Sequence, residues 1–179
     1  LYHDQRAIDL RPQYYEGYRV IAHLYSALKQ PAKSIELAEK AVSLDPLNLN
    51  AQISLAELLY RAEKYQEALT IANTLISQHP QLGAAYNRQG LCHLMLEEYE
   101  SALSAIEQGI HVSGDKGWLA VNYTLVLARS GNSQQAFARL ESHRNGPGKH
   151  WTRLYEAYLF TLVGDTDKAL ESIEHAVST

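Results

Sequence analysis

The stretch from residue 50 to residue 80 reads NAQISLAELLYRAEKYQEALTIANTLISQHP, and apolar residues recur in it at helical spacing. The first run is Ala51, Leu55, Leu58 and Leu59, and the second is Tyr65, Ala68, Leu69, Ala72, Leu75 and Ile76. Each run predicts an amphipathic helix. Because only the two residues Glu63 and Lys64 separate the two patterns, the helices are expected to fold back as an antiparallel hairpin.

Proline marks a fixed period along the chain. Pro12, Pro46 and Pro80 lie 34 residues apart, so we expect an array of one repeated helical hairpin. The predicted units are 1–14, 15–48, 49–82, 83–116, 117–149 and 150–179, together one array over 1–179. The first should hold only a second helix and the last should be incomplete. The chain starts at Leu1 within an apparent helix, so we expect it to be a piece of a longer protein.

Small residues form columns when the units are aligned. The eighth place of each unit reads Ala22, Ala56, Gly90, Thr124 and Ala157, and the twentieth reads Ser34, Ala68, Ala102, Ala136 and Ala169. Small side chains at such places let two helices cross closely, and the next place carries the large residue in Ile35, Leu69, Leu103, Phe137 and Leu170.

A 34-residue helical hairpin with these columns and a closing proline resembles the tetratricopeptide repeat (TPR) family. The resemblance implies an all-α fold, a right-handed α-solenoid of stacked helix pairs. It also implies a concave groove, lined by the first helix of each unit, in which relatives hold peptides or helices of partner proteins. Pro31 is expected to open a second helix, and Gly114 to end one in the left-handed region.

The composition of the chain argues against some classes of function. The formal net charge is −4 and charges of both signs are interspersed, so nucleic acid binding is not expected. No apolar run is long enough to insert in a membrane. The single cysteine, Cys92, excludes an internal disulfide, and together with the lack of a targeting segment in this piece it favours the cytoplasm.

We find no pattern that predicts catalysis. The eight histidines lack the spacing that places two on one metal ion, so no metal site and no cofactor are expected. Cys92 falls in a column of buried leucine and valine residues, which favours a small core residue over a nucleophile. His93 is expected to be a hydrogen-bonded core residue. The chain is therefore interpreted as a non-enzyme.

The resemblance also places residues in the groove. These candidates for partner binding are Arg19, His23, Glu57, Tyr60, Arg61, Asn87, Arg88, Leu91, Met95, Trp118, Val121, Asn122, Leu125, Arg129, Trp151 and Tyr158. The alternative is that the polar ones form a solvated face and that the apolar ones pack within the molecule or under missing segments. The family's clamp for a terminal carboxylate is incomplete, since its places hold Arg19, His23, Ser54, Ala84 and Arg88.

The sequence thus predicts a protein-interaction scaffold within a larger multi-domain protein, for example a bacterial regulatory or assembly factor. Two alternatives stay open. One is a secretion-type chaperone for a partially unfolded client, and the other is a substrate-selecting array attached to a transferase. The partner is a protein or peptide, and the uncapped ends suggest self-association.

Overall fold

The computed structural model describes residues 13–114, 117–143 and 149–177, and this part of the chain forms helices and no strands. The helices are α2 (Tyr15–Ala27), α3 (Pro31–Leu44), α4 (Leu49–Arg61), α5 (Tyr65–Gln78), α6 (Gly83–Met95), α7 (Tyr99–Ser113), α8 (Gly117–Arg129), α9 (Ser133–His143), α10 (Lys149–Leu162) and α11 (Thr166–Val177). The all-α prediction is confirmed. The helix expected before Pro12 lies outside the described residues.

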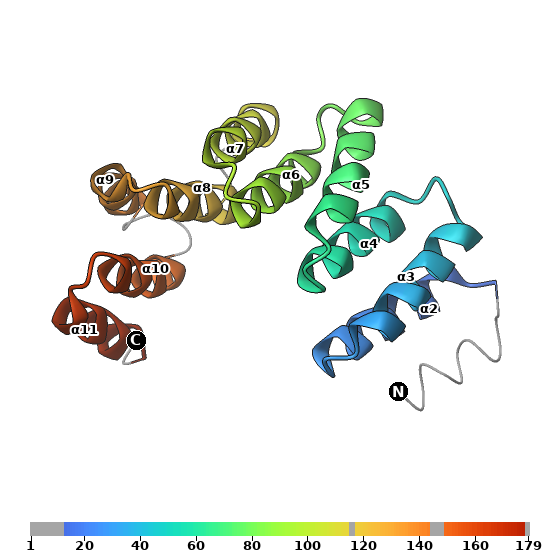
Figure 1. The fold of residues 1–179 in the computed structure, drawn as a ribbon, viewed down its shortest axis with the longest axis horizontal. Helices are drawn as coiled ribbons and strands as arrows, with labels where there is room; N and C mark the ends of the chain where they lie inside the picture. The colour runs from blue at the N-terminus through green and yellow to red at the C-terminus, as the bar shows by residue number, and fades with distance from the viewer. Residues whose placement is uncertain (1–12, 115–116, 144–148, 178–179) are drawn as a thin grey trace.

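The helices stack into an arch, with α2 and α3 at one foot and α10 and α11 at the other (Figure 1). Each even-numbered helix contacts the next even-numbered one, whereas in the described part of the chain no odd-numbered helix contacts the next odd-numbered one. The even-numbered helices therefore form the inner wall of the arch. We call their inward surface, on α2, α4, α6, α8 and α10, the concave face. The predicted α-solenoid is confirmed.

Small residues allow the two helices of each pair to approach. Ala68, Ala102 and Ala136 are fully buried at the crossings of their pairs. Gly90 shows how close the approach is, because a Cβ atom added there would lie 2.4 Å from Cγ1 of Ile106 and 3.0 Å from the carbonyl oxygen of Ala102. The predicted columns of small residues are therefore explained by backbone proximity at the crossings.

The first helix of every pair ends in the same turn. The residues with positive φ are Lys29 (56°), Glu63 (61°), Glu97 (62°), Gly131 (86°) and Gly164 (79°). The amide after each of them donates to the carbonyl five residues earlier, at 2.8 to 3.0 Å, as in Gln30 to Tyr25 and Asp165 to Phe160. This is the Schellman arrangement, which satisfies carbonyl groups at the helix end and reverses the chain direction.

The ends of other helices agree in part with expectation. Pro31 opens α3, as predicted, where its missing N–H is not needed. Gly114 follows α7 with φ 78° and ψ 165°, so the positive φ was predicted correctly. The predicted left-handed helical conformation was wrong, because a ψ of 165° extends the chain instead of turning it back.

The burial of the large apolar residue that follows the small residue at each helix crossing changes along the array. The side chain of Ile35 is 8% exposed, but the equivalent Leu170 on α11 is 55% exposed. In the described part of the chain no helix follows α11 to cover it. No helix in this part is long and apolar enough to cross a lipid bilayer.

Candidate functional site

At the first foot of the concave face, side chains of α2 meet α4. Nε2 of His23 lies 2.8 Å from the buried Ser54 hydroxyl, and Nη1 of Arg19 donates to the same oxygen over 3.4 Å. Arg19 also forms an ion pair with Glu16 on its own helix. Burial lowers the pKa of His23, and the nearby Arg19 adds to this effect, while the carboxylate of Glu57 opposes it. The expected sites Arg19 and His23 are therefore brought together around Ser54.

Between α4 and α6, an arginine stacks on a tyrosine. The Cζ atom of Arg88 lies 4.8 Å from the centroid of the Tyr60 ring, a distance at which a cation is attracted to the ring face. Burial lowers the pKa of Arg88 and raises that of Tyr60. Arg61 on α4 pairs with Glu57, one turn earlier, at 2.7 Å. These four predicted residues thus include one stacked pair and one ion pair.

Between α6 and α8, two amide side chains meet. Nδ2 of Asn122 donates to Oδ1 of Asn87 over 2.8 Å, and both residues are half-buried. The bond uses one donor of Asn122 and one acceptor of Asn87. Because each amide group has further donors and acceptors, the pair can bind another polar group.

Between α8 and α10, Arg129 interacts with tyrosine hydroxyls. Hydrogen bonding to Tyr158 is the largest cause that raises the pKa of Arg129, and Tyr99 contributes in the same direction. Tyr99 lies on α7, a second helix of its pair. Tyr99 is not among the predicted site residues, because those residues all lie on first helices. The sequence feature that could have identified Tyr99 is the tyrosine at the same place in the preceding pair, Tyr65.

The apolar candidates divide into half-buried and more exposed ones. Leu91 and Leu125 are half-buried and pack against the core around Leu94 and Leu119. Val121 is half-buried as well. Met95 and Trp118 are more open, with 37% and 42% of their surface exposed. Trp151 belongs to a part of α10 whose side chains are outside the described residues.

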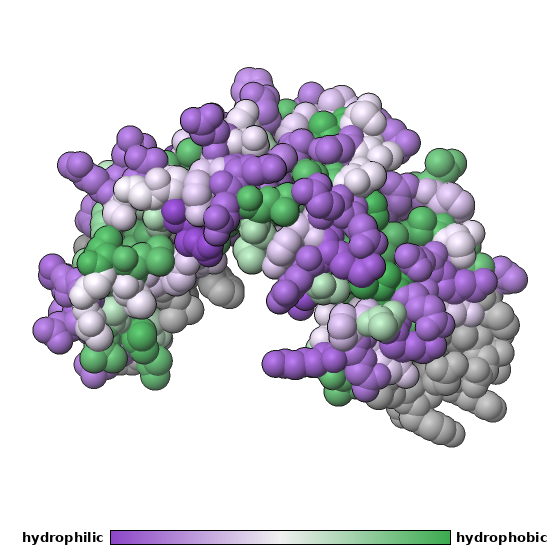
Figure 2. Space-filling model, in the orientation of Figure 1, coloured by the Kyte–Doolittle hydropathy of each residue, from purple (hydrophilic) through white to green (hydrophobic). Residues whose placement is uncertain are grey.

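The surface in Figure 2 is hollowed between the two feet of the arch. Hydrophilic side chains gather on the flank over α2 to α4, and hydrophobic ones are more prominent on the opposite flank, over α10 and α11. Contacts between neighbouring inner helices, from Arg19 and Ser54 to Arg129 and Tyr158, hold this face as one wall.

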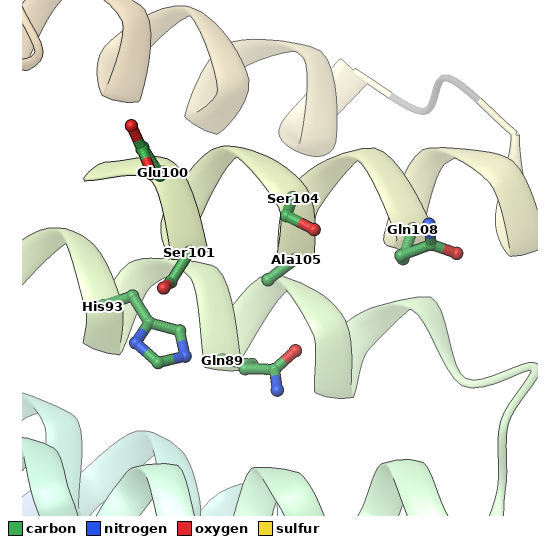
Figure 3. Close-up of a pocket in the computed structure, with 7 residues that line it drawn as sticks. All are labelled: Gln89, His93, Glu100, Ser101, Ser104, Ala105 and Gln108. Atoms are coloured by element: carbon green, nitrogen blue, oxygen red, sulfur yellow. The ribbon is translucent and has the colours of Figure 1, made fainter. Parts of the chain in front are cut away.

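A pocket of about 420 Å³ lies between α6 and α7 (Figure 3). The α6 residues Gln89 and His93 line one side of it, and α7 supplies the other. Nδ1 of His93 lies 2.5 Å from Oε2 of Glu98, so the predicted hydrogen bond is present. The predicted core position is wrong, since the imidazole is half-buried and faces the pocket. In the described part of the chain no three or more His, Cys, Asp or Glu side chains are grouped to hold a metal ion.

Cys92 is fully buried on α6, as the sequence predicts. Burial raises the pKa of its thiol to about 11. A thiol with such a pKa is almost entirely protonated at neutral pH, and a protonated thiol is a poor nucleophile.

Parts of the chain are similar in sequence to known proteins. Residues 28–109 match the family model of the anaphase-promoting complex (cyclosome) subunit 3. A CTR9 homolog protein of Arabidopsis thaliana is 30% identical over 120 residues, which are 65% of this chain and 11% of that protein. The chain thus spans about a tenth of this curated relative.

Solved structures give a fuller match. A thermophilic TPR protein of Thermus thermophilus, TTC0263, superimposes with a TM-score of 0.81 at 21% identity, over 92% of this chain and 90% of that one. YrrB, described as a TPR protein with an unusual peptide-binding site, has a TM-score of 0.59 at 18% identity, over 98% of this chain and 91% of that one. Together with the paired helices and their small-residue columns, these matches show that the chain has the fold of tetratricopeptide repeat proteins.

Proposed function

We propose that the array is a protein-interaction scaffold and that its concave face holds an extended or helical segment of a partner protein. One observation carries the proposal: the inner helices are joined into a continuous surface, and some of their apolar side chains remain exposed to solvent. Neighbouring inner helices are linked by side-chain contacts at every step, and Met95 and Trp118 stay exposed. A fixed wall binds a partner without a large ordering cost.

Two further features support this role over a catalytic one. The single thiol, Cys92, is buried and protonated, which disfavours a cysteine nucleophile. The fold is similar to that of YrrB, a TPR protein with a peptide-binding site. A helix-lined groove of this kind suits a segment anchored by one or two apolar side chains.

The test is a comparison of partner capture by matched variants. The immobilised wild-type chain is exposed to a lysate of its source cells, bound proteins are identified by mass spectrometry, and the affinity for the main one is measured by calorimetry. Met95→Ala with Trp118→Ala should weaken binding about tenfold or more, because exposed aromatic anchors dominate interface energies. Leu47→Ala is the control, since Leu47 is exposed in the loop between α3 and α4.

Both variants must keep the far-UV circular dichroism and melting temperature of the wild type. Equal partner binding by the double variant and the wild type would contradict the use of the concave face. A loss caused equally by Leu47→Ala would point to another surface.

A further inference from the structure

Among the side chains that the structure describes, four arginines lie on the concave face, and two of them are already neutralised. Arg19 pairs with Glu16, and Arg61 pairs with Glu57, in each case within one helix. Local ion pairs of this kind leave little net charge for a partner. The other two arginines, Arg88 and Arg129, are in the middle of the array.

Among the described residues, neither Arg88 nor Arg129 forms an ion pair with a carboxylate. Arg88 is stacked on Tyr60 and is half-buried, and Arg129 interacts with the neutral hydroxyls of Tyr158 and Tyr99. Burial has removed hydration from the Arg88 guanidinium, and the carboxylate of Glu57 acts on it without forming an ion pair, so an incoming anion would restore stabilisation that burial removed. Arg129 is exposed and carries its charge at the surface.

The two guanidinium groups act on the same side chain. Burial raises the pKa of Tyr60, whereas the charges of Arg88 and Arg129 both lower it. Tyr60 therefore feels a positive charge from α6 and another from α8, although it belongs to α4. Such an arrangement concentrates positive potential at the centre of the concave face.

The composition of the two central inner helices also favours a positive charge at the centre of the concave face. The segments GAAYNRQGLCHLM of α6 and GWLAVNYTLVLAR of α8 each contain one arginine and no aspartate or glutamate. The whole chain has a formal net charge of −4. The centre of the concave face is thus positive on an acidic protein, and this contrast selects a partner of opposite charge.

Apolar side chains stand beside these arginines. Arg88, Leu91 and Met95 are three and four residues apart, so they share one face of α6. Leu125 precedes Arg129 by one turn on α8. A ligand that satisfies both kinds of group needs a negative charge next to an apolar side chain.

We propose that the centre of the concave face binds an acidic amphipathic segment of a protein partner, with an internal Asp or Glu carboxylate on Arg88 or Arg129 and a neighbouring apolar side chain on Leu91 and Met95. The inference rests on the proposed scaffold function and adds the chemistry of the partner. It differs from recognition of a chain terminus, because the ligand carboxylate belongs to a side chain.

The experiment is a selection of random 12-residue peptides, displayed with a blocked carboxyl terminus, on the immobilised full chain. The selected peptides should be enriched in Asp or Glu adjacent to Leu, Ile or Phe. A fluorescein-labelled selected peptide, its Asn and Gln counterpart, and the same peptide with a free carboxyl terminus are then compared by fluorescence anisotropy. The acidic peptide should bind about tenfold or more tightly than its amide counterpart, with little gain from a free terminus.

Variants assign the effect to the two arginines. Arg129→Gln removes the charge but keeps an amide that can bond to Tyr158, and Arg88→Gln tests the stacked position. Both variants must keep the melting temperature of the wild type. Replacement of the arginine that holds the carboxylate should weaken the acidic peptide about tenfold and leave the amide counterpart nearly unchanged, and full binding by both variants would overturn the proposal. Arg61→Gln is the matched control on the same face, because Arg61 is already paired with Glu57.

Several outcomes would overturn the proposal. They are selected peptides without acidic enrichment, equal binding of the acidic and amide peptides, a strong requirement for the free terminus, and preferential binding of a uridine-rich RNA by the same arginines. If partner capture depends on Trp118 but not on Arg88 or Arg129, only this inference fails. If capture is independent of both, the scaffold role of the concave face fails as well.

Discussion

The hydroxyl of Ser34 on α3 donates a 2.8 Å hydrogen bond to the carbonyl oxygen of Ala22 on α2. These residues meet where the two helices of the first pair cross, and the later pairs have alanine in place of Ser34. The serine therefore fits a space made for a methyl group, and its one polar atom is satisfied by the facing backbone.

We predict that Ser34→Ala costs about 1 kcal/mol or less, since the carbonyl of Ala22 is within a helix and the methyl group fits. Ser34→Leu should cost about 1 to 3 kcal/mol or more, because the added atoms would force the helices apart. Urea unfolding of both variants measures the difference. A leucine variant as stable as the wild type would contradict the close crossing.

Gly90 gives a sharper version of the same test. Gly90→Ala gains up to about 1 kcal/mol in helix propensity. The new Cβ would, however, meet Cγ1 of the buried Ile106 at 2.4 Å, so we expect a net loss of about 1 to 3 kcal/mol.

The control for Gly90→Ala is a double-mutant cycle with Ile106→Ala, which removes the clashing atom. The two changes should cost less together than the sum of their separate costs. Additive losses would mean that the strain arises elsewhere.

Because the turns after the first helices share one backbone conformation, substitutions at their positive-φ residues should change stability in opposite directions. Gly131→Ala places a side chain at φ 86° and should destabilise the array by about 1 to 2 kcal/mol. Glu97→Gly relieves a non-glycine residue at φ 62° and should stabilise by up to about 1 kcal/mol, after the larger entropy of glycine in the unfolded chain is subtracted. Calorimetric melting of both variants checks the signs, and a stabilising Gly131→Ala would rule out the shared turn.

The sequence was sufficient for the features that packing restricts tightly. Ala68 and Ala102 could be placed at helix crossings because only small residues fit there, so the period alone identifies them. The stacking partners Arg88 and Tyr60 are both among the residues that the same register predicts for the concave face.

Their stacking could not be foreseen, because long side chains on a surface have many rotamers and the period does not select one. The contact of Arg129 with Tyr99 crosses from a first helix to the second helix of the preceding pair. Such a contact depends on how far each pair is rotated against the next. The ψ of Gly114 is also set by how the chain enters α8, and not by glycine itself.

His23 provides the final prediction, on the dependence of stability on pH. Burial beside Arg19 lowers its pKa in the folded chain below the ordinary value of 6.5. The unfolded chain therefore binds a proton at a pH where the folded chain resists it, so this contribution to stability is present above about pH 6.5 and is lost as pH falls through the folded pKa. The wild type should lose more stability than His23→Gln between about pH 7.5 and about pH 5, because glutamine can bond to Ser54 without titrating. Urea unfolding across this range, with an NMR titration of the His23 ring, measures both quantities, and a ring midpoint at or above 6.5 would refute the assignment.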